Sequence, residues 1–181
     1  MRRGALIALA LGTALLTSGC SVAVNGVTGV GVDANGQLVG YVKVCSFHTA
    51  SLVLWTDAEG RPVGEWTPPE AITDFGSWSL DDSTDGWSTE VAPPARTDDD
   101  VYQLEGWTDE LLAGTARTVG IRYTVRDLAA LRPGEVLWTV SRFREEPPRT
   151  TVTSVDEFRL TACTASYDDA DLSPTPSSSG S

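Results

Sequence analysis

The chain has 181 residues, of which 41% are hydrophobic and 21% are charged, and this is enough for one domain with a buried core. Its 25 aspartate and glutamate residues outnumber 13 lysine and arginine residues, so the formal net charge is −12 at pH 7. Such an acidic chain repels the phosphate backbone of nucleic acids. The composition therefore excludes nucleic-acid binding as the function.

The first 19 residues predict a secretory signal peptide. Arg2 and Arg3 precede an apolar run from Ala5 to Leu16, and small residues follow. The run is too short for a membrane-spanning helix, so residues 1–19 are left out of the fold. Without the two arginines, 11 basic residues oppose 25 acidic ones, and the net charge becomes about −14.

The residues LTSGC, from Leu16 to Cys20, resemble the lipobox of bacterial lipoproteins. In that class the cysteine is acylated and the chain is cleaved just before it, so the resemblance implies that Cys20 becomes a lipidated N-terminus. It also implies export and a lipid anchor at the outer face of the cell membrane, with residues 20–22 as a short tether. Thr17 stands where the lipobox usually has leucine, and a plain secretory signal with an incidental cysteine is the alternative.

Two β-hairpins are predicted directly after the tether. The segment VAVNGVTGVGVDANGQLVGYVKVC turns at Asn35 and Gly36, a residue pair typical of two-residue hairpin turns. The segment SLVLWTDAEGRPVGEWTP turns around Glu59 and Gly60. The same turn chemistry is used twice, with an aspartate that caps its own turn and a glycine that supplies positive φ.

The middle of the chain, residues 67–100, is rich in turns and acidic side chains. From Asp74 to Glu110, eleven carboxylates face one arginine, Arg96. We expect long acidic loops here, with short strands around residues 76–80 and 87–91.

The stretch DDSTDGW carries half of a calcium-loop pattern. Asp81, Ser83 and Asp85 place oxygen ligands at alternate positions before a glycine. The twelfth position is Ala92 instead of a bidentate glutamate, so a distant carboxylate from residues 98–100 would have to complete a calcium site. A solvated acidic turn is the alternative.

Six tryptophans are many for a domain of this size. Most are expected in the core, Trp138 among them, because each ring buries a large apolar area. Trp78 and Trp87 lie in the polar acidic segment, so we expect this pair to be exposed and to contact a ligand such as a sugar ring.

The second half of the chain predicts further strands. VYQLEGW is expected to be a strand, and TDELLAG a single helical turn capped by Thr108. TVGIRYTV alternates, with Ile121, Tyr123 and Val125 on one face, which is typical of a half-buried strand. A final strand is expected from Val155 to Cys163.

The segment RDLAALRPGEVLWTVSRF combines an apolar turn carrying Leu128 and Leu131, a Pro-Gly turn and a new strand. It resembles the crossing between late strands of immunoglobulin-like and fibronectin-like sandwiches. We therefore expect an all-β fold over residues 23–167, an antiparallel β-sandwich of about seven to nine strands, immunoglobulin-like, with long acidic loops. Residues 168–181 form a polar tail that cannot bury enough apolar surface to order itself.

With Cys20 acylated, Cys45 and Cys163 remain, and an exported protein is in a compartment where they can pair. We expect one disulfide between them. In regular strands each cysteine would face away from the neighbouring apolar side chains, so the bridge should lie outside the sandwich core.

No catalytic motif stands out, and we assign no catalytic residue. A serine triad or a cysteine–histidine nucleophile would need His48, the single histidine, and no motif surrounds it. The chain also resembles small actinobacterial lipoproteins in its opening segment and its Ser/Thr/Pro tail, a resemblance that implies no particular activity. We expect a non-enzymatic binding or scaffolding module with an envelope glycan or protein as partner and no cofactor, with calcium as the alternative. The alternatives are a carbohydrate- or calcium-dependent binding module and an envelope hydrolase.

Overall fold

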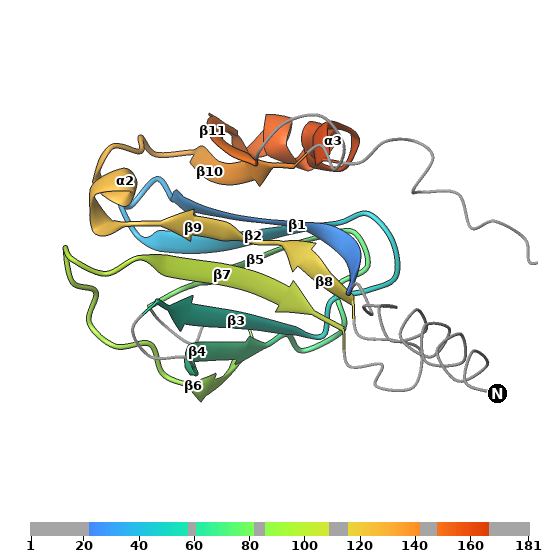
Figure 1. Ribbon diagram of the computed structural model, residues 1–181, viewed down its shortest axis with the longest axis horizontal. Helices are drawn as coiled ribbons and strands as arrows, with labels where there is room; N and C mark the ends of the chain where they lie inside the picture. Colours follow the sequence, from blue (N-terminus) through green and yellow to red (C-terminus); the bar gives the residue numbers. More distant parts are fainter. Residues whose placement is uncertain (1–21, 58–60, 82–85, 109–115, 142–147, 167–181) are drawn as a thin grey trace, which may run out of the picture.

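The computed structural model describes residues 22–57, 61–81, 86–108, 116–141 and 148–166 (Figure 1). Within these ranges the chain is mostly β-structure, so the all-β expectation is confirmed. The strands are β1 (Ala23–Val32), β2 (Leu38–Val44), β3 (Ser51–Thr56), β4 (Pro62–Thr67), β5 (Phe75–Ser79), β6 (Ser88–Val91), β7 (Tyr102–Trp107), β8 (Ala116–Val119), β9 (Ile121–Tyr123), β10 (Glu135–Val140) and β11 (Arg149–Ser154). The helices are α2 (Val125–Ala129) and α3 (Val155–Ser166).

All eleven described strands belong to one curled sheet, with the order β11-β10-β1-β8-β7-β3-β4-β6 along its main path. Strand β2 pairs with β1 and β5, and β9 pairs with β7. The sheet is mixed, because β1 and β8 run parallel. The strands of the described chain therefore do not show the purely antiparallel, two-sheet arrangement expected from the sequence.

The first predicted hairpin is confirmed. Strands β1 and β2 pair antiparallel, and Gly36 in the turn between them has a φ of +83°. Asp33 Oδ1 accepts hydrogen bonds from the backbone N–H groups of Asn35 and Gln37, both at 2.8 Å. These bonds, the one from Gln37 foremost, lower the pKa of Asp33. In the second predicted hairpin β3 and β4 pair antiparallel, while its turn residues 58–60 lie outside the described residues.

The curl of the sheet encloses an apolar core. Trp66 of β4 and Trp78 of β5 lie with their ring centroids 6.2 Å apart, so two strands that are distant along the sheet meet across its concave face. The Trp78 ring lies directly over Gly40 of β2, where an added Cβ would be 2.3 Å from a ring atom. The lack of a side chain at Gly40 therefore makes room for the tryptophan.

Tyr102 and Tyr123 stack in this core with ring centroids 5.7 Å apart. Burial raises the pKa of Tyr123 to about 12, against the opposing effect of the nearby Arg96 guanidinium. A phenol with a raised folded pKa contributes stability that is fully present below its unfolded pKa near 10 and is lost as the pH rises toward 12. We expect Tyr123→Phe to remove this pH dependence. Between pH 10 and 11 the unfolding free energy of the wild-type protein should fall by about 1 kcal/mol more than that of the variant, when both are measured against pH. Parallel pH curves for the two proteins would contradict the assignment.

The predicted final strand is wrong, because Val155–Ser166 forms helix α3. The buried residues Phe158, Ala162 and Ser166 recur every four positions, which is the period of a helix face. Ser154 Oγ accepts a hydrogen bond from the Glu157 N–H at 3.2 Å and so caps the helix. The letters SVDE, from Ser154 to Glu157, are the capping-box pattern that marks this start.

Helix α3 covers the outer face of the sheet, beside β10 and β11 (Figure 1). Phe158 packs edge-on against Trp138 and Phe75, with ring centroids 5.5 and 6.5 Å apart. The predicted disulfide is present, since the Sγ atoms of Cys45 and Cys163 are 2.10 Å apart. It was expected outside the core, but Cys45 is half-buried and packs against the cluster of core residues beneath α3. The bridge joins the end of β2 to a helix instead of joining two strands.

The other late elements follow the sequence prediction in part. Strand β7 and the short strands β5 and β6 are present where they were expected. The alternating segment TVGIRYTV is divided into β8 and β9 at Gly120, and Val125 already belongs to α2, which Thr124 caps. Leu128 is buried as predicted. The helical turn expected after Thr108 falls on residues 109–115, outside the described chain.

Candidate functional site

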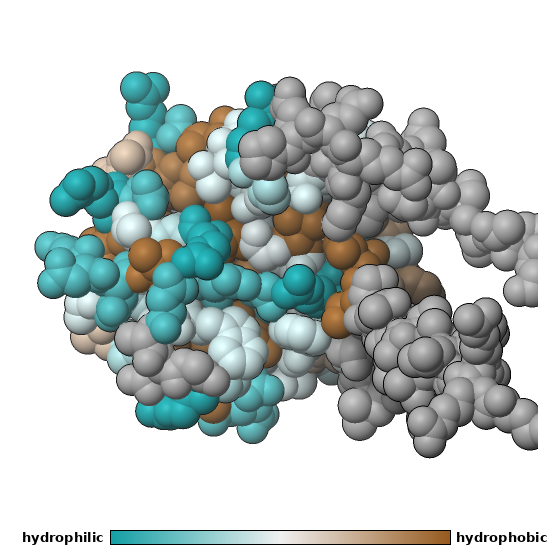
Figure 2. Space-filling view, viewed as in Figure 1, coloured by the Kyte–Doolittle hydropathy of each residue, from teal (hydrophilic) through white to brown (hydrophobic). Residues whose placement is uncertain are grey.

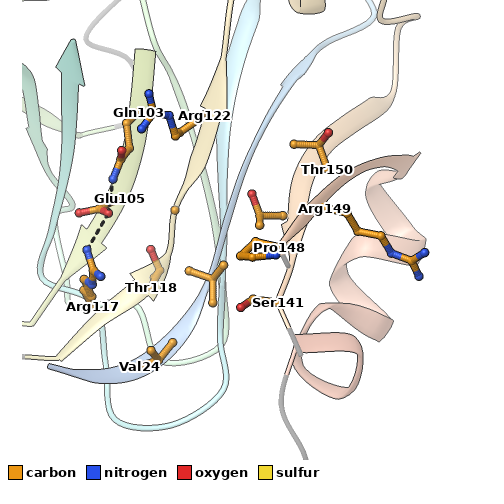
Figure 3. Close-up of a pocket in the computed structure, with 13 residues that line it drawn as sticks. Val24, Gln103, Glu105, Arg117, Thr118, Arg122, Ser141, Pro148, Arg149 and Thr150 are labelled. Atoms are coloured by element: carbon orange, nitrogen blue, oxygen red, sulfur yellow. Dashed lines mark hydrogen bonds and ion pairs between the residues drawn. The ribbon is translucent and has the colours of Figure 1, made fainter. Parts of the chain in front are cut away.

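A fork in the sheet creates the pocket described here. Residues 23–27 of β1 pair with β8, whereas residues 29–31 pair with β10. The branch formed by β7, β8 and β9 therefore separates from the branch formed by β10 and β11, and a pocket of about 380 Å³ lies between them. Figure 3 shows Gln103, Glu105 and Arg117 on one side and Ser141, Pro148 and Thr150 on the other.

Glu105 is the central side chain of this pocket. It is only 4% exposed, although it lies on the opposite face of β7 from the core residues Tyr102 and Leu104. Its Oε1 atom accepts hydrogen bonds from Gln103 Nε2 at 2.5 Å and from Arg117 Nη1 at 3.1 Å. These two donors fix the carboxylate in one orientation at the pocket wall.

Gly120 explains how a carboxylate on an outer face becomes buried. An added Cβ at Gly120 would lie 2.7 Å from Glu105 Cγ, so only glycine allows the β8–β9 junction to approach so closely. Thr118 holds the same junction, because its hydroxyl accepts a hydrogen bond from the Gly106 N–H at 2.8 Å and is also hydrogen bonded to the Thr28 hydroxyl. The floor of the pocket is therefore tied to both neighbouring strands.

The charges around the pocket are almost balanced. Arg117 is paired with Glu105, and Arg122 is paired with Asp57 at 2.6 Å. The Arg149 side chain points away from the opening (Figure 3). The pocket therefore offers hydrogen-bond donors and acceptors without a large net charge.

The other residues that line the pocket are partly apolar and partly polar. They include Val24, Val119 and Pro148 together with the hydroxyl-bearing residues Thr139, Ser141 and Thr150. On the face drawn in Figure 2, hydrophobic surface is visible between hydrophilic side chains in the region between β8 and β10. Such a mixture is typical of small-molecule sites, in which apolar walls surround a few fixed polar groups.

The calcium prediction is only partly within the described chain. Asp81 is exposed, and its carboxylate accepts a hydrogen bond from Arg96 Nη1 at 2.5 Å. Ser83 and Asp85 lie outside the described residues. The described parts of the chain contain no cluster of three metal-ligating side chains. A cation that approached Asp81 would have to displace Arg96.

The expectation that Trp78 and Trp87 are exposed is wrong for Trp78. Only 3% of Trp78 is exposed, because its ring lies in the inner core. Trp87 is half-buried and stacks on Trp78 with a centroid distance of 5.2 Å. The two rings cover each other, so they do not form an open platform for a sugar ring. Trp138 is buried, as predicted.

Two predicted cysteine roles have different outcomes. Cys45 and Cys163 are engaged in the disulfide, whereas Cys20 lies outside the described residues. The sequence reading did not single out Glu105, Arg117 or Gln103 as site residues. Glu105 was one acid among eleven, and its burial depends on a glycine fifteen positions later in the chain. No local pattern predicts that approach.

Comparison with known proteins adds no assignment, since no protein-family model, no curated protein and no solved structure matches this chain.

Proposed function

We propose that this chain is an exported protein, acylated at Cys20 and held at the outer face of the cell membrane, whose domain binds a small hydroxyl-rich ligand such as a saccharide in the Glu105 pocket. The lipobox-like residues LTSGC support the anchor. No described helix is long and apolar enough to cross a membrane.

The observation that carries the binding proposal is the buried Glu105 carboxylate, fixed by Gln103 and Arg117 at the wall of the pocket. A sugar hydroxyl both donates and accepts hydrogen bonds, so it is matched by a carboxylate beside an amide and a guanidinium. Because these groups already hold one another, little conformational entropy is lost when a ligand binds.

We thus propose that carbohydrate binds in the Glu105 pocket and not at Trp78 and Trp87, where the sequence had suggested it. An envelope hydrolase would need a pair of carboxylates across the scissile bond. Among the described residues that line the pocket, Glu105 is the only carboxylate. We therefore propose binding without chemistry as the activity of this site.

We also propose that the immunoglobulin-like resemblance is confined to the segment from α2 to β10. In its support, Leu128 of α2 is buried and Gly134 in the following turn has a φ of +83°. The rest of the topology, with its parallel β1–β8 pair, has its own arrangement.

The binding proposal is tested by calorimetric titration of the purified acylated protein with a panel of neutral mono- and disaccharides. We expect at least one saccharide to bind, and Glu105→Gln to weaken that binding about tenfold or more, because the charge-assisted hydrogen bonds of the site are lost. The substitution keeps the size and shape of the side chain. A melting curve of the variant checks that it remains folded.

Glu157→Gln is the matched control, because Glu157 is exposed on α3 and does not line the pocket. It should bind like the wild-type protein. If no saccharide binds the wild-type protein, or if both variants bind equally well, the Glu105 pocket is not a saccharide site.

A further inference from the structure

We infer that Phe47 is a second, non-covalent membrane contact, which inserts into the lipid surface next to the anchor. This inference rests on the proposed acylation of Cys20. It goes beyond that proposal because it assigns a lipid-binding role to a residue of the folded domain.

Phe47 is both exposed and strained. It lies in the loop between β2 and β3, 68% of its surface is exposed, and its φ is +59°. In the described chain it is the single non-glycine residue with positive φ. For a bulky side chain this backbone conformation is unfavourable. Residues in such conformations are found most often at functional sites, where the surrounding structure holds them in place.

The loop is held in this conformation by contacts on both sides of Phe47. The carbonyl oxygen of Asn25 accepts hydrogen bonds from the N–H groups of Cys45 and Ser46, at 2.8 and 3.0 Å. The Asn25 side chain is fully buried and donates to the His48 carbonyl oxygen at 2.7 Å. Cys45 is also fixed to α3 by its disulfide. Phe47 therefore lies exposed on a loop that hydrogen bonds and a disulfide hold in place.

The same contacts tie the loop that carries Phe47 to the segment that leads to the proposed anchor. Asn25 follows Cys20 by five positions, and an extended chain spans at most about 3.3–3.6 Å per residue, or about 18 Å over that interval. The loop that carries Phe47 is clamped to Asn25, so an acylated Cys20 brings this loop to the membrane surface. Val22, in the short tether, is also an exposed apolar residue, with 43% of its surface accessible.

A lipid surface is the occupant that fits this end of the domain. The mature chain is strongly acidic, so electrostatic attraction to anionic lipids would not hold it. An inserted aromatic side chain contributes through burial of apolar surface and does not depend on charge. Together with the anchor it would restrict rotation of the domain and fix which of its faces, including the Glu105 pocket, is turned to the membrane.

The test uses the acylated full-length mature protein, labelled with 4-fluorophenylalanine and reconstituted in phosphatidylcholine vesicles. The chain has four phenylalanines, and the resonance that disappears in Phe47→Ser identifies Phe47 in the fluorine NMR spectrum. We expect this resonance to be broadened by a nitroxide-labelled lipid and protected from a water-soluble paramagnetic chelate. Intact mass spectrometry of the same sample shows whether Cys20 carries acyl chains.

The outcomes separate the two proposals. Broadening by the chelate alone, on an acylated protein, overturns the Phe47 contact and leaves the anchor intact. Protection from both agents means that protein covers Phe47, which also overturns it. A mass without acyl chains refutes the anchor and, with it, the inference.

A second variant separates membrane contact from folding. Phe47→Gly removes both the side chain and the strain, because glycine adopts positive φ readily. We expect it to unfold at a denaturant concentration no lower than that of the wild-type protein. Marked destabilisation of Phe47→Gly would indicate that Phe47 serves the fold, and would overturn the assignment.

Discussion

Replacing both Cys45 and Cys163 by alanine should lower the free energy of unfolding by about 4–5 kcal/mol. The disulfide closes a loop with a sequence separation of 118, so its loss restores a large part of the conformational entropy of the unfolded chain. In the folded protein it also joins α3 to the end of β2. Denaturant unfolding of the double variant and of the wild-type protein measures the difference.

The control for this prediction is the wild-type protein under reducing conditions, which should unfold at the same denaturant concentration as the double variant. Removing both cysteines avoids an unpaired thiol that could form dimers. A loss below about 1 kcal/mol would mean that the unfolded chain is already compact in this region, because the entropic effect would then be small.

Phe158→Ala should destabilise the fold by about 3–5 kcal/mol. The side chain is fully buried, and its ring lies between Trp138 of β10 and Phe75 of β5. Alanine would leave a cavity beneath α3, which lowers the stability of the folded protein. Unfolding free energies from chemical denaturation give the magnitude.

Leu160→Ala provides a matched control on the same helix. Leu160 is 79% exposed, so its truncation removes little buried surface and should change stability by about 0.5 kcal/mol or less. Equal effects of Phe158→Ala and Leu160→Ala would show that α3 does not pack on the sheet in the way described. The pair separates packing from helix propensity, since both variants introduce the same residue.

The contrast between Phe158 and Leu160 also explains why the last element was predicted incorrectly. Two apolar residues separated by two positions lie on the same face of a strand, whereas in a helix they point about 200° apart. A strand over residues 155–163 would therefore place both side chains on one face. The capping residue Ser154 and the acids Asp156 and Glu157 were the local signals for a helix start.

The exposure of Trp78 was predicted incorrectly for a different reason. Trp78 comes just before the acidic stretch DDSTD, and these neighbours along the chain indicate exposure. Its ring is buried because Gly40, on another strand, leaves room for it and because Trp66 closes the core from the opposite side. Contacts between strands that are far apart in the sequence decided the environment of this residue.

The sequence by itself determined many of the local elements and the disulfide pairing. The Asn-Gly turn, the strands after it, the late Pro-Gly turn and the pairing of Cys45 with Cys163 follow from turn preferences, hydrophobic alternation and the number of cysteines left after Cys20. Each of these features depends on residues that are neighbours in the chain or, for the disulfide, on the number of cysteines. The lipobox-like LTSGC segment is a motif of the same local kind.

Only the tertiary structure decided where the chain forms a pocket and which residues line it. The fork at β1, the close approach of Gly120 to Glu105 and the clamp of Asn25 on the Phe47 loop each join segments that are separated in the sequence. Strand order and register set these distances, and they result from the packing of the whole sheet. Whether a glutamate in a strand is a solvated surface charge or the centre of a binding site depends on that packing.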